Sequence, residues 1–132
     1  MSQTIGVGII ARNAESTIRT CIQSFAPHVD QIVVVLAGKS EDKTARLAKK
    51  ASTKVELYDF SWIDDFSAAR NFCFSKLRTD WLMWVDADDE VYQAENLRRL
   101  CETSHPEIGG IWFPYHYALD EFGNVTTIYE RE

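Results

Sequence analysis

The sequence predicts an α/β fold in which helices flank a mostly parallel sheet and a β-hairpin follows. Short runs of β-branched and apolar residues alternate four times with segments whose apolar residues follow helical spacing. The connections between these runs are short, and a repeated strand–loop–helix order is typical of parallel sheets covered by helices. Two further strand-like runs then follow each other with no helical segment between them, which indicates an antiparallel hairpin.

The first repeat opens with Thr4–Ile10 (TIGVGII), whose β-branched and apolar residues suit a buried strand. The next helix is expected to start behind a cap at Asn13 or Ser16, because either side chain can accept a hydrogen bond from the first turn. It should continue to about Phe25, since Pro27 cannot extend a helix.

The next two repeats keep this order. Gln31–Leu36 (QIVVVL) predicts a second buried strand, and Ser40 or Asp42 is expected to cap the helix behind it. Lys54–Phe60 (KVELYDF) alternates apolar and polar residues and predicts the third strand. Phe66–Leu77 predicts the third helix, because its apolar residues are spaced to face a core.

Trp81–Val85 (WLMWV) predicts a fourth strand that is buried on both faces, because none of its side chains needs water. Gln93–Thr103 predicts the fourth helix. The hairpin strands are expected at Gly109–Ala118 and Asn124–Glu130, with Leu119–Gly123 between them.

Composition limits the classes of protein to which the chain can belong. A single domain covering residues 1–132 is expected, because a chain of this length buries roughly two thirds of its unfolded surface. A net charge of −6 and the lack of a basic run argue against a nucleic-acid partner. Cys21, Cys73 and Cys101 each fall in a predicted helix and are expected to be buried thiols. With no recognisable leader and no apolar run of membrane-spanning length, we expect a cytoplasmic protein without a transmembrane segment.

The candidate site lies where the four strands end, because open parallel sheets bind ligands beyond the carboxyl ends of their strands. Polar side chains follow every predicted strand. They are Arg12, Asn13 and Glu15 after the first, Asp42 after the second, Asp64, Asp65, Arg70 and Asn71 after the third, and Asp86, Asp88, Asp89 and Glu90 after the fourth.

The last of these groups has the most informative spacing. Four carboxylates lie within Asp86–Glu90 and repel one another unless a cation holds them. If the backbone stays extended beyond the strand, Asp86 and Asp88 point to the same side. Carboxylate oxygens suit Mg²⁺ or Mn²⁺, and such ions keep positions for phosphate and water. The alternative is a solvated acidic turn in which Asp89 or Glu90 only favours the dipole of the next helix.

Arg70 also allows two interpretations. Its planar, permanently charged guanidinium is suited to a phosphate or a base. Alternatively, Arg70 is a surface cation that pairs with Asp64 or Asp65, and Asp65 is itself well placed to cap the third helix.

Four blocks of sequence carry a resemblance to a known family. They are IIARNAES, DQIVVVLAGKSEDKT, FSWIDDFSAARN and DWLMWVDADD, and GGIWFPYHYALDEFGNV follows them. In order and spacing, from about Ile5 to Glu90, the chain resembles the family 2 glycosyltransferases of the GT-A fold, whose sheet is Rossmann-like. The bacterial subgroup that often carries helical repeats downstream is the most similar. A lone DxD motif would be weak support, whereas four ordered blocks are specific.

The resemblance implies a nucleotide-sugar donor, a UDP-sugar in the first instance, bound with Mn²⁺ or Mg²⁺, and a saccharide, lipid or protein acceptor. Asp88 would bind the metal that bridges the diphosphate, and Asp86 would lie near the ribose or the metal's water shell. Arg70 would lie near the nucleotide, and Arg12–Glu15 against the base. The donor-binding residues implied in this way are Arg12, Asn13, Glu15, Asp42, Asp65, Arg70 and Asp86, with Asp88 and Asp86 as the metal ligands.

The family pattern further implies inversion at the anomeric centre by direct displacement. The metal would act as a Lewis acid that stabilises charge developing on the departing nucleoside diphosphate.

Two features depart from the pattern. Family members usually end the second strand with an aspartate that contacts the nucleoside, whereas this chain has Leu36, which cannot accept a hydrogen bond. Lys39 is then an extra residue before Asp42, which matches a later aspartate of the same block. The family's catalytic base lies beyond the hairpin, and nothing before Glu132 matches that segment. We therefore assign no catalytic residue and expect a chain truncated at its C-terminus that holds the donor half of the site.

Other functions remain open at this point. A non-catalytic module could keep the fold and hold only a nucleotide or a protein partner. A nucleotidyltransferase uses a related fold, but it normally has a Gly-rich basic loop after the first strand, which ARNAES is not. A flavodoxin-like phosphoacceptor domain needs its acidic cluster after the first strand, whereas the acids here follow the fourth.

Overall fold

Four strands form a parallel sheet in the order β3-β2-β1-β4, and two more form a separate antiparallel pair. The computed structural model describes residues 3–38, 42–104, 107, 109–111, 113–119 and 125–131. The strands are β1 (Ile5–Ala11), β2 (Gln31–Ala37), β3 (Val55–Phe60), β4 (Trp81–Trp84), β5 (Phe113–Leu119) and β6 (Val125–Arg131). The helices are α1 (Ile18–Gln23), α2 (Thr44–Ala51), α3 (Phe66–Ser75) and α4 (Leu97–Thr103), with 3₁₀ turns η1 (Ala26–His28) and η2 (Ala94–Asn96).

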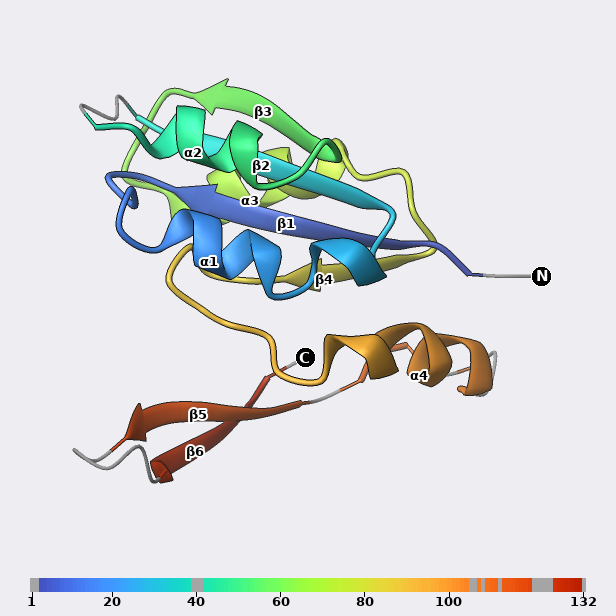
Figure 1. Cartoon of the computed structure of the whole chain (residues 1–132). Helices are drawn as coiled ribbons and strands as arrows, with labels where there is room; N and C mark the ends of the chain where they lie inside the picture. The colour runs from blue at the N-terminus through green and yellow to red at the C-terminus, as the bar shows by residue number, and fades with distance from the viewer. Residues whose placement is uncertain are drawn as a thin grey trace.

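Helices cover both faces of the parallel sheet (Figure 1). α1 and α2 lie on one face, α3 lies on the other, and α4 follows beyond the β4 edge. The β5–β6 hairpin is a second sheet after α4. The predicted α/β fold, a mostly parallel sheet with flanking helices and a hairpin after it, is confirmed.

The core forms because β1 and β2 lie between other strands, and β2 carries apolar side chains on both faces. Ile32 and Val34 of β2 belong to the larger cluster, which includes the buried residues of α1. Val33 and Val35 point to the opposite face, where they meet Cys73 of α3. Each such side chain contributes about 1.5–3 kcal/mol when it is fully buried. The sheet is therefore held by its two central strands.

On the face toward α3, β1 carries glycines in place of large side chains. A Cβ added at Gly8 would lie 2.8 Å from Sγ of Cys73 and 3.1 Å from Cε1 of Phe74. A Cβ added at Gly6 would lie 2.8 Å from Cδ2 of Leu77. The missing side chains let α3 and the residues after it pack directly on the strand.

Two aspartates hold the amino-terminal end of β1. Asp30 accepts hydrogen bonds from the Ile5 amide at 2.8 Å and from Nη2 of Arg98 at 3.0 Å, so β1, β2 and α4 meet there. Asp80 accepts a hydrogen bond from the amide of Thr4 at 2.8 Å, and this bond lowers the pKa of its carboxyl. These contacts keep β1 and β4 in register.

The prediction that the fourth strand is buried on both faces is wrong. β4 ends at Trp84 and pairs only with β1 among the described residues, so it is an edge strand. Leu82 is 48% exposed, and Trp81, Met83 and Trp84 are half-buried. The apolar run could not reveal this, because strand order is not encoded in the composition of a single strand.

Several expected helix ends also differ. Neither Asn13 nor Ser16 caps α1, which begins at Ile18 without a side-chain cap and ends at Gln23. The reason is local: Asn13 has a φ of 49°, and the amides of Thr17 and Ile18 donate to the Ala14 carbonyl in a turn before the helix. α3 ends at Ser75, before the expected Leu77. The segment from 93 divides into η2 and α4.

One expected helix cap is confirmed, and another is not. Asp65 is the N-cap of α3 and accepts a hydrogen bond from the amide of Ala68 at 3.1 Å. The N-cap of α2 is Lys43, which makes no side-chain cap, whereas the expected cap Asp42 lies one residue earlier and accepts a hydrogen bond from the amide of Thr44 at 3.0 Å. Ser40, the other candidate cap, lies outside the described residues, as does the expected hairpin turn Leu119–Gly123 except for Leu119, which belongs to β5.

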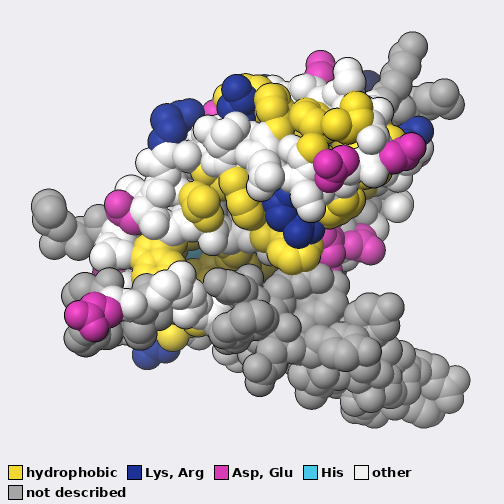
Figure 2. All heavy atoms as spheres, turned by 180° about the vertical axis from the view of Figure 1, so that it is seen from behind, with side chains coloured by type: hydrophobic (Ala, Val, Ile, Leu, Met, Phe, Trp, Pro, Cys, Tyr) yellow, Lys and Arg dark blue, Asp and Glu magenta, His cyan; other side chains and the backbone are white. Residues whose placement is uncertain are grey.

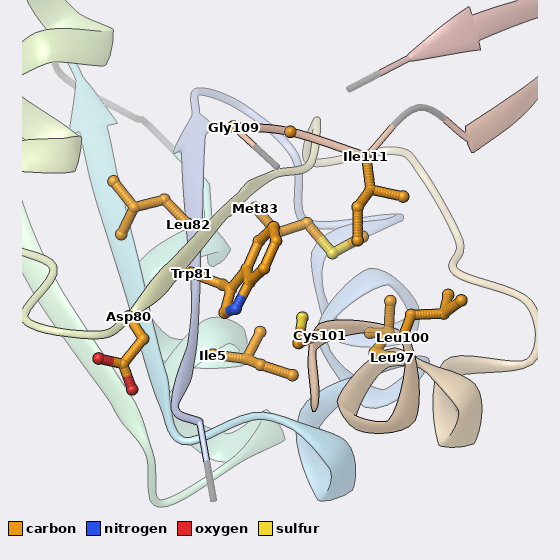
Figure 3. A pocket seen from close by; sticks show the side chains of 11 residues that line it. Ile5, Asp80, Trp81, Leu82, Met83, Leu97, Leu100, Cys101, Gly109 and Ile111 are labelled. Carbon is orange, nitrogen blue, oxygen red and sulfur yellow. The ribbon is translucent and has the colours of Figure 1, made fainter. Parts of the chain in front are cut away.

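A cavity of about 280 Å³ lies between β4, α4 and residues 109–111, at the end of the sheet where β1 and β4 begin. Figure 3 shows Trp81, Met83, Cys101 and Ile111 directed toward it, whereas Asp80 points away. Its lining is mostly apolar, and it lies at the opposite end of β4 from the acidic residues. The cavity is therefore separate from the candidate site.

The close approach of α3 to β1 leads to a prediction. Replacing Gly8 with alanine should lower the free energy of unfolding by about 1–3 kcal/mol, because the new methyl group overpacks against Cys73 and Phe74. Gly109→Ala is the control, since a Cβ there meets no described heavy atom within 4 Å. Both changes reduce the freedom of the unfolded chain equally, so their difference in urea denaturation measures the overlap. Equal stabilities would show that α3 does not lie as close as described.

Candidate functional site

The loops after β1 and β2 are joined by reciprocal hydrogen bonds. Oδ2 of Asp42 accepts from the amide of Glu15 at 3.2 Å, and Oε2 of Glu15 accepts from the amide of Lys43 at 3.1 Å. Oγ1 of the buried Thr44 accepts from the amide of Ala14 at 2.8 Å and donates to Asp42. The bond from Thr44 is the main cause of the lowered pKa of Asp42. Both predicted carboxylates thus set the position of these loops.

A glycine brings the first three loops together at the same edge. Gly38 follows β2 with a φ of 80°, a left-handed conformation that favours glycine. Its amide donates to the Phe60 carbonyl at 2.9 Å, which ties it to the end of β3. A Cβ on Gly38 would lie 3.8 Å from Cζ of Arg12 and 3.5 Å from Cβ of Trp62. Arg12, which is exposed, therefore lies over this junction.

The acidic segment after β4 forms a turn. The amide of Asp89 donates to the carbonyl of Asp86 at 3.0 Å, and the amide of Asp86 donates to Oδ2 of Asp89 at 3.0 Å. The expectation of an extended backbone beyond Val85 is therefore wrong. The turn nevertheless gathers three carboxylates, since one ligand oxygen each of Asp86, Asp88 and Asp89 lies within 4.8 Å of the others.

The sequence argument missed Asp89 as part of this cluster, because it treated the residue as a turn or cap only. Asp86 and Asp89 are half-buried and Asp88 is exposed. The sequence does show an aspartate, Asp89, directly after the DxD motif. The direction of its side chain depends on the turn, which the sequence pattern did not predict. Asp86 and Asp88, the predicted metal ligands, do lie together.

Helix α1 supports the acidic turn from below. The thiol of Cys21 donates to the carbonyl of Asp86 at 3.3 Å, and Oγ of Ser24 accepts from the amide of Val91 at 2.9 Å. Burial, followed by the charges of Asp89 and the other nearby carboxylates, raises the pKa of Cys21 to about 12. The sulfur therefore stays protonated and keeps its hydrogen to donate.

Arg70 stacks on aromatic rings in place of pairing with an acid. Its Cζ lies 3.5 Å from the centroid of the Trp84 ring and 5.0 Å from that of Phe66. Among the described residues Arg70 forms no ion pair with Asp64 or Asp65, so the expected alternative is wrong: Asp65 caps α3, and Asp64 accepts a hydrogen bond from Nε1 of Trp62. Stacking of this kind contributes about 0.5–2 kcal/mol.

The predicted residues thus fall into two groups at one edge. Arg12, Asn13, Glu15 and Asp42 belong to the joined loops after β1 and β2, and Asn13 adopts a left-handed conformation. Arg70, Asp86 and Asp88 belong to the end of β4 and the helix beside it, with Asp65 as the helix cap. Leu36 is half-buried and packs against the core, so it offers no polar atom in place of the usual aspartate.

The surface around Arg70 is partly apolar. Trp62 is 37% exposed, Phe66 is 47% exposed and Ile63 is 63% exposed, and all three belong to the segment that leads into α3. Figure 2 shows the side of the molecule that carries α3, where hydrophobic side chains lie beside basic and acidic ones. Trp62 packs against Phe66, and Phe66 in turn contacts the guanidinium of Arg70.

The three carboxylates are chemically suited to a divalent metal. Hard cations such as Mg²⁺ take oxygen ligands and usually bind through one or two carboxylates while retaining water and phosphate. Asp88 is the most accessible member, whereas Asp86 and Asp89 are fixed by the turn. The donor set therefore fits the metal that the resemblance implies.

Comparisons with known proteins show which proteins the chain is similar to. The model of glycosyl transferase family 2 matches residues 6–115. A TPR repeat-containing protein of Synechococcus elongatus is 34% identical over 87 residues, which are 66% of this chain and 21% of that protein. The SPbeta prophage-derived glycosyltransferase SunS of Bacillus subtilis is 32% identical over 101 residues, 76% of this chain and 24% of SunS. The chain thus spans about a quarter or less of these curated relatives.

The fold also matches a solved structure. S. aureus TarS 1–349 superposes with a TM-score of 0.60 at 21% identity, over 74% of this chain and 31% of TarS 1–349. At this identity the likeness shows the fold alone. Among the described residues, none of the helices combines the length and apolar character needed to cross a membrane.

The environment of Cys21 leads to a second prediction. Iodoacetamide at about pH 8 should not modify Cys21 in the folded protein, because burial and the nearby carboxylates keep the thiol protonated. Mass spectrometry after brief labelling measures this, and the same reaction in urea, where Cys21, Cys73 and Cys101 all become accessible, is the control. Rapid labelling of Cys21 in the native protein would contradict its place beneath the acidic turn.

Proposed function

Because the chain belongs to glycosyl transferase family 2, we propose that it forms the donor-binding half of a glycosyltransferase. In this proposal it binds a nucleotide-sugar, a UDP-sugar in the first instance, together with Mn²⁺ or Mg²⁺. The observation that carries the proposal is the gathering of the Asp86, Asp88 and Asp89 carboxylates at the carboxyl edge of the sheet. That edge is where parallel sheets bind nucleotides.

Each group of residues has a role in the proposal. Asp88, which is exposed, would hold the divalent cation, and Asp86 would lie near the cation's water shell or the ribose; the cation would supply positive charge to the phosphates of the donor. Arg70 directs its positive charge toward the phosphates. Arg12 and Asn13 lie against the base, on loops that Asp42 and Glu15 hold together.

The proposed reaction transfers the sugar with inversion to a saccharide, lipid or protein acceptor. A bound divalent cation would supply Lewis-acid stabilisation of the charge on the departing nucleoside diphosphate. The chain's own carboxylates hold that position, and Arg70 adds a fixed positive charge near it. We assign the role of catalytic base to none of the described residues. The proposal therefore does not name the group that removes the proton from the acceptor hydroxyl.

A second candidate is a module that binds a nucleotide without transferring sugar. Leu36 favours it, because this residue packs in the core where family members usually present an aspartate to the nucleoside. The two candidates differ in turnover. Transfer or hydrolysis of a radiolabelled UDP-sugar by this chain, or by a longer chain that contains it, supports the enzyme, whereas nucleotide binding without turnover in both supports the module.

Binding of metal and nucleotide tests the proposal directly. Saturating Mn²⁺ with UDP should raise the melting temperature, because ligands that bind only the folded state stabilise it by mass action. Asp88→Asn should weaken metal binding in calorimetry by at least about tenfold, a cost that even outer-shell partners of metals can show. Its exposure means that the fold should survive.

Glu90→Gln is the matched control for this substitution. It removes the same charge from the same exposed segment, but Glu90 does not belong to the cluster of three carboxylates. If Mn²⁺ with UDP causes neither a shift in melting temperature nor a heat of binding, the donor site is refuted. If Asp88→Asn binds metal as well as Glu90→Gln does, the metal binds elsewhere.

A further inference from the structure

Trp84 contacts both charged parts of the candidate site. It is the last residue of β4, and its Cα partner on β1 is Gly8, whose missing side chain leaves the face toward α3 open. Arg70 of α3 reaches this face and places its guanidinium 3.5 Å from the centroid of the Trp84 ring. Because the side chain of Trp84 is half-buried, its ring is restrained where the two contacts meet.

The edge of the same ring holds the first aspartate of the acidic turn. Nε1 of Trp84 donates to Oδ1 of Asp86 at 3.1 Å. The backbone amide of Asp86 donates to Oδ2 of Asp89, so both the backbone and the side chain of Asp86 are restrained. A carboxylate with one oxygen held by a donor keeps its other oxygen in a defined direction, which is the usual outer-shell arrangement of metal ligands.

The flat face of the ring positions the cation. Nε of Arg70 is buried and has no hydrogen-bond partner among the described residues. Its orientation is therefore set by stacking between Trp84 and Phe66. A guanidinium held in this way loses little of its bonding capacity, so its terminal nitrogens can serve an anionic ligand.

We infer that Trp84 is a positioning residue of the donor site, which orients Asp86 for a divalent cation and Arg70 for the phosphates that accompany it. This inference rests on the proposed function. One side chain links the two charged parts by separate contacts. Its indole N–H contacts Asp86, and its ring face contacts Arg70. Loss of the N–H therefore affects the metal, whereas loss of the ring affects metal and phosphate together.

Trp62 offers a matched control within the chain. Its Nε1 donates to Oδ1 of Asp64 at 2.8 Å, which is the same spacing of two residues as in the pair of Trp84 and Asp86. Its ring packs against Phe66, with centroids 6.2 Å apart. Asp64 is not a member of the carboxylate cluster. Trp62→Phe thus removes an equivalent hydrogen bond without touching the proposed metal ligands.

The first test uses the unaltered chain labelled with ¹⁵N. Addition of Mg²⁺ with UDP should shift the indole N–H resonance of Trp84, because its acceptor Asp86 then also faces the cation, and should leave that of Trp62 nearly unchanged. A structural role alone would not produce this selectivity. If Trp84 moves no more than Trp62 while calorimetry reports binding, the inference is overturned and the proposed function survives.

The second test separates the two contacts. Trp84→Phe keeps a ring for Arg70 and removes the N–H, so affinity for Mn²⁺ should fall about 10- to 100-fold, the usual effect of losing an outer-shell partner of a metal ligand. Its affinity for UDP in EDTA should stay unchanged. Trp84→Leu should weaken both, and Trp62→Phe neither. Thermal unfolding checks that each variant is folded, and the resonance test needs no variant.

Two results would contradict the inference. Trp84→Phe with the metal affinity of the unaltered chain would show that the N–H does not orient Asp86. Trp84→Leu with unaltered affinity for UDP would show that the ring does not orient Arg70. If the unaltered chain binds neither Mn²⁺ nor UDP, the proposed function fails and the role of Trp84 fails with it.

Discussion

The parallel pairing of β4 with β1 is the constraint on which the candidate site depends. The pairing ends where the amide of Val85 donates to the carbonyl of Gly8 at 3.2 Å, and the chain turns immediately afterwards. The acidic turn is therefore delivered to the edge where β1 and β2 also end. With glycine at position 8, α3 packs on the sheet closely enough to bring Arg70 over Trp84. The register of one strand pair thus places an acid, a ring and a cation together.

Hydrogen bonds from the surrounding chain hold the acidic turn in place. Three carboxylates within 4.8 Å of one another repel, and the structure offsets this with hydrogen bonds from the Asp86 amide and the Trp84 indole. The Cys21 thiol fixes the backbone of the same turn. A preorganised cluster costs folding energy but reduces the ordering needed when a ligand binds.

Much of this could be predicted from the sequence, because the β-branched runs of β1 and β2 and the short connections leave few arrangements besides a parallel sheet. From that arrangement alone, the sequence predicts that Asp86, Asp88 and Arg70 lie at one edge of the sheet. The exposure of Leu82 could not be foreseen, since it depends on β4 being an edge strand. The inclusion of Asp89 depends on a turn made by backbone hydrogen bonds, and the stacking of Arg70 on Trp84 depends on contact between distant segments.

The most direct measurement of the central claim is the position of the metal itself. Crystals grown with Mn²⁺ and UDP, with data collected to detect the anomalous signal of manganese, would locate it. The account predicts one strong peak within about 2.0–2.6 Å of carboxylate oxygens of the acidic turn, the range for hard divalent cations, with the diphosphate between this peak and Arg70. A peak elsewhere on the chain, or ordered UDP with no metal at the turn, would contradict it.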